Sequence, residues 1–234
     1  MSTTRFDLSI RQTLRSGSRS FELDISIRSH SQQLVVHGPS GAGKSMLLRA
    51  IAGLSRPDAG HIRLDGRSLF DSSNRIHLSP QQRQLGYLFQ DYALFPHLTV
   101  RQNIGFGLQR GWFNPARRHR SAAVDYWLEA FGLNAQSDQL PATLSGGQRQ
   151  RTALARALVA KPRALLLDEP FSALDPALRS QLRTELAELL QRLDIPMLLI
   201  THDAEDIRSF GQHTIYLQDG RMVSAPTRAQ EPRA

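Results

Sequence analysis

The sequence predicts an α/β fold in which a core of parallel strands carries a glycine-rich loop and a helical segment is inserted into the core. Short apolar runs at residues 34–36, 164–167 and 197–200 are each followed by polar residues, as in buried parallel strands. The first run leads through a glycine-rich turn into apolar residues at helical spacing, which continue as far as Leu54. Between about residues 90 and 160 the pattern is helical, which predicts the insertion.

The glycine-rich turn at residues 38–45 has the composition of a phosphate-binding loop. Its glycines let backbone N–H groups point inward, and a helix that begins near Lys44 adds the positive end of its dipole. We expect the Lys44 ammonium to reach the β- and γ-phosphates of a nucleotide and the Ser45 hydroxyl to ligate Mg²⁺. The alternative is a glycine-rich turn before an ordinary helix, but Lys44 and Lys161 are the only lysines among 29 basic residues. The residues assigned to the nucleotide here are Gly38, Pro39, Ser40, Gly41, Ala42, Gly43, Lys44 and Ser45.

Alternating apolar and polar residues predict antiparallel strands around this loop. The alternation runs through residues 6–10 and 21–27 on either side of a polar turn, and through residues 60–70 around Asp65-Gly66, a hairpin signal. Farther along, Asp175-Pro176 is typical of a helix start. The helix that follows is expected to share one apolar face made of Leu178, Leu182, Leu186, Leu189 and Leu193.

Polar side chains at the carboxyl ends of the predicted strands are candidates for catalysis. Open α/β sheets bind their ligands at this edge, so Asp168 is expected to hold Mg²⁺ through water, opposite Ser45. Glu169 is placed to polarise the attacking water, and His202 can hydrogen-bond a γ-phosphate. Gln90 follows an apolar stretch and could contact Mg²⁺ and that water as a neutral ligand. Taken singly, an acidic pair at a strand end or a lone histidine is often only structural.

A second anion-binding segment lies before another predicted helix. Ser145, Gly146, Gly147 and Gln148 precede apolar residues at helical spacing, so backbone N–H groups and the Ser145 hydroxyl can face an anion. One chain would then have two phosphate-binding edges for one triphosphate.

In these segments, and over nearly its whole length, the chain resembles the ATPase subunits of ATP-binding cassette transporters. Residues 38–45 are similar to the Walker A loop and residues 165–169 to the Walker B strand. The other matches are Gln90 to the Q-loop, residues 144–148 to the family signature, residues 172–175 to the D-loop and His202 to the switch histidine. The resemblance implies a P-loop NTPase core, with a RecA-like sheet and an antiparallel β subdomain at about residues 1–89 and 161–225, and a helical subdomain at about residues 90–160.

The resemblance also implies how such a chain is assembled. Two cassettes pair head to tail, and the signature and Asp175 of one close on the Mg²⁺-ATP held by the other, which accounts for the surplus anion site. Closure drives transmembrane permease subunits, and indirectly a substrate-binding protein delivers the cargo. A place on the cytoplasmic side of the inner membrane, as a peripheral subunit, follows from this.

Within the family, the sequence is most similar to the ATPases of importers and, among these, to the molybdate-importer ATPase. Residues 94–100 resemble the importer segment that lies in the groove receiving a permease helix; the alternative is a loop that packs its own Phe95. Residues 66–83 resemble the molybdate-importer ATPase, although sulfate, iron, thiosulfate and polyamine importers share most features. Two departures stand out: residues 14–19 lack the aromatic that stacks on adenine in many cassettes, and we expect no β-rich C-terminal regulatory domain.

Composition excludes several other classes of protein. Cysteine is absent, which excludes disulfides and thiolate metal sites, and no apolar run approaches the roughly 20 residues of a membrane-spanning helix. The formal charge of +8 comes from scattered arginines without interleaved aromatics, so no nucleic-acid partner is expected. The competing hypotheses are a cassette protein that acts on DNA or ribosomes and an inactive structural cassette.

Overall fold

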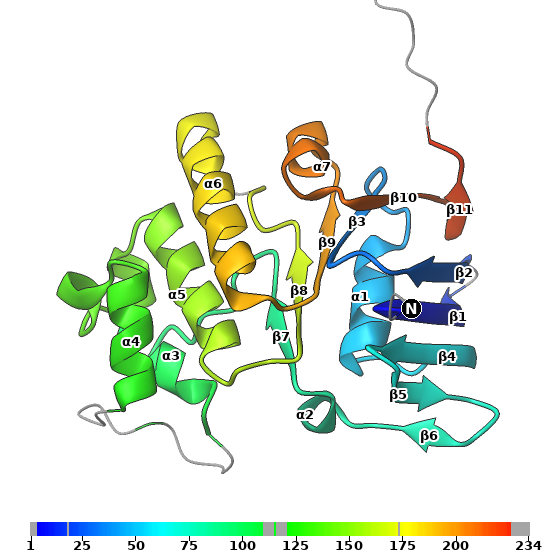
Figure 1. Ribbon diagram of the computed structural model, residues 1–234, viewed down its shortest axis with the longest axis horizontal. Helices are drawn as coiled ribbons and strands as arrows, with labels where there is room; N and C mark the ends of the chain where they lie inside the picture. The colour runs from blue at the N-terminus through cyan, green and yellow to red at the C-terminus, as the bar shows by residue number, and fades with distance from the viewer. Residues whose placement is uncertain (1–3, 18, 110–114, 116–120, 173, 226–234) are drawn as a thin grey trace, which may run out of the picture.

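The computed structural model describes residues 4–17, 19–109, 115, 121–172 and 174–225, and these form one mixed sheet with helices on both faces (Figure 1). The strand order is β6-β5-β4-β1-β2-β11-β10-β3-β9-β8-β7. The strands are β1 Phe6–Ser16, β2 Arg19–Ser29, β3 Gln33–His37, β4 Ala59–Leu64, β5 Arg67–Asp71, β6 Ile76–His77, β7 Leu85–Leu88, β8 Ala164–Asp168, β9 Met197–Thr201, β10 His213–Gln218 and β11 Arg221–Val223.

Strands β10, β3, β9, β8 and β7 are neighbours and pair in parallel. Their register sets His37 opposite Thr201, and Asp168 opposite Ile200, so the carboxyl ends of β3, β8 and β9 meet at one edge. The remaining strands pair antiparallel, apart from the parallel contact of β11 with β2, and β1 joins β2 in the hairpin that the alternation predicted.

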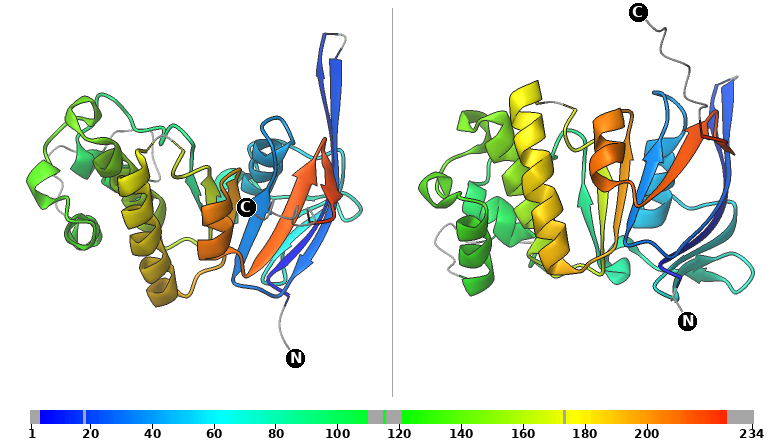
Figure 2. Two further views of the ribbon diagram at one scale, coloured as in Figure 1. Left: turned by 90° about the horizontal axis from the view of Figure 1, so that it is seen from above. Right: turned by 45° about the horizontal axis from the view of Figure 1, so that its top comes forward.

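The helices cover the two faces of the parallel strands. Figure 2 shows α1 on one side and α5 and α6 on the other. The helices are α1 Lys44–Ala52, α2 Pro80–Arg83, α3 Val100–Phe106, α4 Ala122–Ala130, α5 Gly146–Leu158, α6 Pro176–Leu193 and α7 Ala204–Phe210. Two short 3₁₀ turns, Asn134–Gln136 and Pro141–Thr143, lie between α4 and α5. No helix in the described part of the chain is long and apolar enough to cross a membrane.

Alternate residues of β3, β7, β8 and β9 enter two separate cores. Leu166 of β8 packs with α1 and the antiparallel strands, whereas Leu165 and Leu167 pack with the helices on the other face. This two-sided burial explains why the strands read as continuous apolar runs. It also fixes their register, because a one-residue slip would move every side chain to the wrong core.

The predicted elements are present, with one correction at the end of α1. Helix α1 ends at Ala52 because Gly53 adopts φ +82°, and Leu54, which was expected on its apolar face, lies beyond the helix and is 50% exposed. In α6 the predicted apolar face is confirmed: Leu182 and Leu186 are buried, and Leu178, Leu189 and Leu193 pack partly buried against the same core, which also includes Leu190. The four-residue step from Leu186 reaches Leu190, which the sequence interpretation passed over.

Candidate active site

The phosphate-binding loop leaves the carboxyl end of β3 and enters α1, as the sequence predicted. The N–H of Gly38 donates to the carbonyl of Thr201 at 3.4 Å, which ties the loop to β9. A Cβ on Gly38 would lie 2.1 Å from the carbonyl oxygen of Leu217, so only glycine fits there. Gly43 precedes α1 at φ +99° and forms no side-chain cap, which leaves first-turn N–H groups of the helix available to an anion.

Lys44 is the buried cation of this loop. Its side chain is 5% exposed, and Nζ donates to the carbonyl oxygens of Gly38 at 2.8 Å and Pro39 at 3.0 Å. Nζ also lies 3.5 Å from Oε1 of Glu169. A buried ammonium group requires anionic or carbonyl partners. Lys44 therefore gives this end of the loop a fixed positive charge that can bind phosphate.

Asp168 ends β8 beside the first turn of α1. The Ser45 hydroxyl donates to Oδ1 of Asp168 at 3.2 Å, and the Tyr87 hydroxyl donates to Oδ2 at 3.2 Å. Burial raises the pKa of Asp168 above its usual value of 3.8, although both hydrogen bonds act in the opposite direction. A buried carboxylate next to a hydroxyl is a suitable oxygen donor pair for Mg²⁺, whose remaining ligands would be phosphate oxygens and water.

Glu169 lies between the buried Lys44 and His202. Its Oε2 is 3.1 Å from Nδ1 of His202, on the opposite side from Lys44. Glu169 also has φ +45°, a left-handed conformation that costs a non-glycine residue energy and turns its side chain away from the line of β8. The structure thus separates the two adjacent carboxylates, with Asp168 facing Ser45 and Glu169 facing His202.

Two hollows next to the loop share Ser45 and Gln90. One, of about 720 Å³, is also lined by Asp168, and the other, of about 300 Å³, by Lys44 and Glu169. Gln90 is exposed and follows β7, so it lies between the residues proposed for the metal and those proposed for the water. The structure therefore brings Lys44, Ser45, Gln90, Asp168, Glu169 and His202 together.

The smaller hollow also includes two apolar side chains that the sequence interpretation did not assign. Leu14 and Phe21 are opposite each other in the β1–β2 hairpin and both line it, next to Gly43 and Lys44. Leu14 is 51% exposed. The residues at positions 14–17 and 19 form the end of this hairpin, and Ser18 lies outside the described residues. No motif marks Leu14 and Phe21, but pairing the two predicted strands places them opposite each other.

The signature residues are elsewhere in the chain, at the start of α5. Ser145 caps this helix, accepting from the N–H of Gln148 at 3.3 Å, while Oε1 of Gln148 accepts from the N–H of Ser145 at 2.9 Å. A Cβ on Gly146 would meet Leu174 at 3.2 Å, so the signature touches the segment before α6. None of the described residues 144–148 lines the two hollows beside the phosphate-binding loop.

Asp175 serves the next helix as its N-cap. Its Oδ1 accepts from the N–H of Leu178 at 3.0 Å, as the sequence predicted for the start of α6. Within the described residues, Asp175 does not line the hollows beside Lys44. Ala173 of the same segment lies outside the described residues.

Arginines of α6 join this segment to the loop that carries His202. Arg179 donates to the carbonyl of Leu174 at 3.0 Å and to Oδ2 of Asp203 at 3.1 Å. Asp203 follows His202 directly and caps α7. The two loops therefore share one guanidinium, and neither moves without disturbing it.

Arg183, which is also in α6, holds the same loop. Its Nε donates to Oδ1 of Asp206 at 2.6 Å and its Nη2 to Oδ2 of Asp203 at 2.5 Å, while the Thr201 hydroxyl donates to the other Asp206 oxygen at 2.5 Å. Asp206 is 2% exposed, and burial raises its pKa. This network fixes the backbone on both sides of His202.

The comparisons with known proteins agree with this geometry. The sequence model of the family described as ABC transporter matches residues 22–172. The molybdenum import ATP-binding protein ModC of Paramagnetospirillum magneticum is 42% identical over 212 residues, which is 91% of this chain and 57% of that protein. The Fe(3+) ions import ATP-binding protein FbpC of Pseudomonas fluorescens (strain Pf0-1) is 48% identical over 193 residues, which is 82% of this chain and 53% of that protein. The chain thus spans little more than half the length of these relatives.

A solved structure extends the similarity to the fold. It is a dimeric, post-hydrolysis state of an ATP-binding cassette bound to ADP and Pi, 28% identical, with a TM-score of 0.75 over 94% of this chain and 96% of that one. The α/β P-loop NTPase fold predicted from the sequence is therefore confirmed.

Replacing Asp168 by Asn is expected to stabilise the protein as the pH rises. Because the folded pKa of Asp168 is raised above 3.8, the native state holds its proton longer than the unfolded chain, and stability falls as pH increases through that window. The amide carries no charge to bury. We expect the thermal unfolding midpoint of Asp168→Asn to exceed that of wild type at pH 7 and the difference to shrink toward pH 4.

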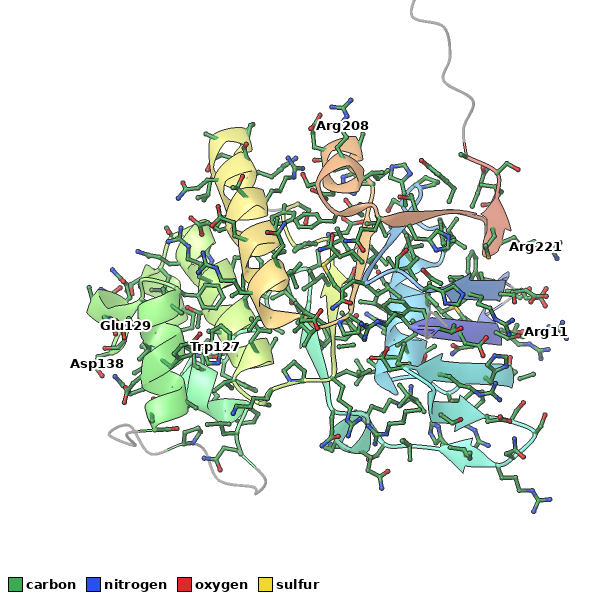
Figure 3. All side chains as sticks on the ribbon, in the orientation of Figure 1. Arg11, Trp127, Glu129, Asp138, Arg208 and Arg221 are labelled. Carbon is green, nitrogen blue, oxygen red and sulfur yellow. The ribbon has the colours of Figure 1, made fainter. Side chains whose placement is uncertain are left out.

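The matched control is Asp138→Asn, on the outer side of the helical part (Figure 3). It should show no such pH-dependent difference from wild type. A lower midpoint for Asp168→Asn at pH 7 would contradict the assigned burial cost.

Removing Arg183 is expected to destabilise the fold through Asp206. Arg183→Leu leaves a buried carboxylate without its cation, which costs about 3 kcal/mol in the free energy of unfolding. Denaturant unfolding measures this, and Arg183→Leu with Asp206→Asn should recover part of the loss because the buried charge is gone. Arg192→Leu, an exposed arginine of the same helix, is the control. Equal losses in the single and double variants would show that Asp206 is not the cause.

Proposed function

Because the chain belongs to the ABC transporter family, we propose that it is the ATP-hydrolysing, energy-coupling subunit of a bacterial importer. One observation carries the proposal: the Glu169 carboxylate is held between Nζ of Lys44 at 3.5 Å and Nδ1 of His202 at 3.1 Å, next to the Ser45–Asp168 pair. A base, a phosphate-binding cation and an orienting histidine thus share one edge of the sheet. An inactive structural cassette would not need this arrangement.

Each residue has a defined part in the hydrolysis that we propose. Lys44 and the first-turn N–H groups of α1 bind the terminal phosphates of ATP and neutralise their charge. Glu169 accepts a proton from the attacking water, and His202 holds the γ-phosphate in place for that attack. Gln90, at the rim of both hollows, contacts this water. Mg²⁺, held through Ser45 and Asp168, would supply charge stabilisation to the phosphates.

The second anion-binding segment supports a head-to-tail homodimer. Ser145, Gly146, Gly147 and Gln148 start a thirteen-residue helix that does not face the Lys44 hollow of its own chain. In a two-fold dimer this helix start and Asp175 would close on the ATP bound by the other copy. The similar solved cassette is described as dimeric and bound to ADP and Pi, which supports this assembly.

A shallow groove beside the Gln90 loop supports a permease partner. It has a volume of about 440 Å³, and its lining includes Tyr87, Phe95 and Phe106. The rings of Phe95 and Phe106 are 4.3 Å apart, and Arg156 lies over Phe95 while donating to the carbonyls of Tyr92 and Ala93. Phe95 thus packs against α3 and α5 and still lines the groove. A permease helix bound in this groove would contact the residues next to Gln90.

Molybdate or a related oxyanion is the cargo that we propose. The molybdenum import relative aligns with 91% of this chain, and residues 66–83 carry the resemblance noted in the sequence. Iron, sulfate or thiosulfate, and polyamine importers are also similar and are the alternatives. We further propose that the chain acts as one cassette, with a core at about residues 1–89 and 161–225 and a helical subdomain at about residues 90–160. It would sit peripherally on the cytoplasmic side of the inner membrane, with a substrate-binding protein across it.

The proposal predicts that Glu169→Gln abolishes molybdate uptake. The amide keeps the shape of the side chain but accepts no proton, and a general base contributes about 10²- to 10⁴-fold to rate. Uptake of labelled molybdate is measured in cells whose only copy is wild type or the variant, with sulfate uptake as the specificity control. We expect molybdate uptake to fall at least about a hundredfold.

Glu129→Gln on the outer side of α4 is the matched variant, and it should transport normally (Figure 3). Loss of sulfate uptake instead of molybdate uptake would overturn the cargo, and unchanged uptake of both would overturn the coupled-hydrolysis role in molybdate import.

A further inference from the structure

A basic hollow lies at the edge of the sheet opposite to the phosphate-binding loop. It has a volume of about 180 Å³ and is found where β7, β8 and β9 begin, next to α2 (Figure 1). Its charged lining comes from far apart in the sequence and consists of Arg5, Arg67, Arg83, Arg163, Asp65 and Asp194. Four arginines against two aspartates give this lining a formal charge of +2.

Arg83 is the fully buried member of this lining. It is 0% exposed, and Nη1 donates to the carbonyls of Ala50 and Ile51 at 2.6 Å, which caps the end of α1. Its Nε donates to the carbonyl of Leu78 at 3.0 Å. Among the described residues, Nη2 has no hydrogen-bond partner and Arg83 has no ion pair. Burial lowers the pKa of Arg83 to about 10, which leaves it charged at neutral pH.

An unpartnered, buried guanidinium nitrogen is costly and indicates a missing acceptor. A buried donor without a partner costs about 1–3 kcal/mol, and more when it is charged. Main-chain carbonyls satisfy the other two nitrogens of Arg83, but they bring no negative charge to it. Arg83 lines the hollow, so an anion bound there would place a negative charge next to this guanidinium.

The other arginines are positioned around the same hollow. Arg67 is fixed by donating to the carbonyls of Gln82 at 2.6 Å and Arg83 at 3.3 Å. Arg163 is exposed, and only its Nε is engaged among the described residues, with Oε1 of Gln84 at 3.0 Å. Its two terminal nitrogens can therefore turn to a ligand. Guanidinium groups are suited to the paired oxygens of phosphate and related oxyanions.

The two carboxylates lower the positive charge of this lining but do not cancel it. Asp65 is paired with Arg5 at 3.1 Å, and Asp194 accepts from Nε2 of Gln32 at 3.0 Å. Neither forms an ion pair with Arg67, Arg83 or Arg163 within the described residues. The volume is below the roughly 300–1,000 Å³ of pockets for drug-sized ligands, so a nucleotide does not fit but an anion of phosphate size does.

We propose that this hollow is a binding site for a small tetrahedral oxyanion of the phosphate class, held by Arg67, Arg83 and Arg163. The site is separate from the nucleotide loop and independent of the function proposed above. By joining α2 to the end of α1, the bound anion stabilises the helix whose other end forms the phosphate-binding loop.

The test is calorimetric titration of the full chain with inorganic phosphate, in the Lys44→Ala background so that the nucleotide loop is disabled. Ionic strength is held constant with potassium chloride, because exposed charges respond to salt alone. We expect saturable binding at one site. Arg67→Gln with Arg163→Gln should weaken it at least about tenfold, since two charge-assisted contacts are lost.

The control removes two exposed arginines elsewhere, Arg28→Gln with Arg192→Gln, and should leave phosphate affinity within about twofold of the background. Arg163→Glu is a second variant that leaves the carbonyl contacts of Arg67 intact, and the reversed charge should also weaken binding at least tenfold. Absence of saturable binding, or equal affinity in the pocket and control variants, would overturn the proposal.

Discussion

The buried ammonium of Lys44 is the interaction on which the rest of the site depends. It is held by two loop carbonyls and by Glu169, and these partners arrive from β3 and β8 only because the parallel register aligns the strand ends. The same register sets His202 beside Glu169. A buried cation without such partners would turn out to solvent. The burial of Lys44 therefore depends on the strand register that brings its partners together.

The two cores of the parallel sheet separate the two helix starts that we propose to bind anions. The start of α1 belongs to the core with the antiparallel strands, whereas α5 packs into the helical core on the other face. Arg179 links Leu174, which lies next to the signature, with Asp203 in the loop of His202, and Arg183 also donates to Asp203. Gly146 of the signature packs close to Leu174, so packing and the hydrogen bonds of Arg179 together connect this surface with the loop of His202.

The local sequence pattern predicted most of the fold, because buried strands and glycine turns depend on residues that are consecutive in the sequence. It placed Lys44, Asp168 and Glu169 correctly at one sheet edge. It did not place the hairpin residues Leu14 and Phe21 at the hollow beside Lys44, nor Arg83 at the end of α1, because these contacts join distant segments and no motif marks them. The end of α1 at Gly53 was also passed over, since a left-handed glycine outweighs the apolar Leu54 beyond it.

The central claim is that one ATP site is built from Lys44 of one copy and Ser145 of another. The most direct measurement is ATP hydrolysis by an equal mixture of Lys44→Ala and Ser145→Arg chains, each inactive alone. A head-to-tail dimer gives one intact site per mixed dimer, so the mixture should regain about a quarter of wild-type activity. A mixture as inactive as either variant alone would contradict the shared site and would place the whole reaction within a single chain or in another assembly.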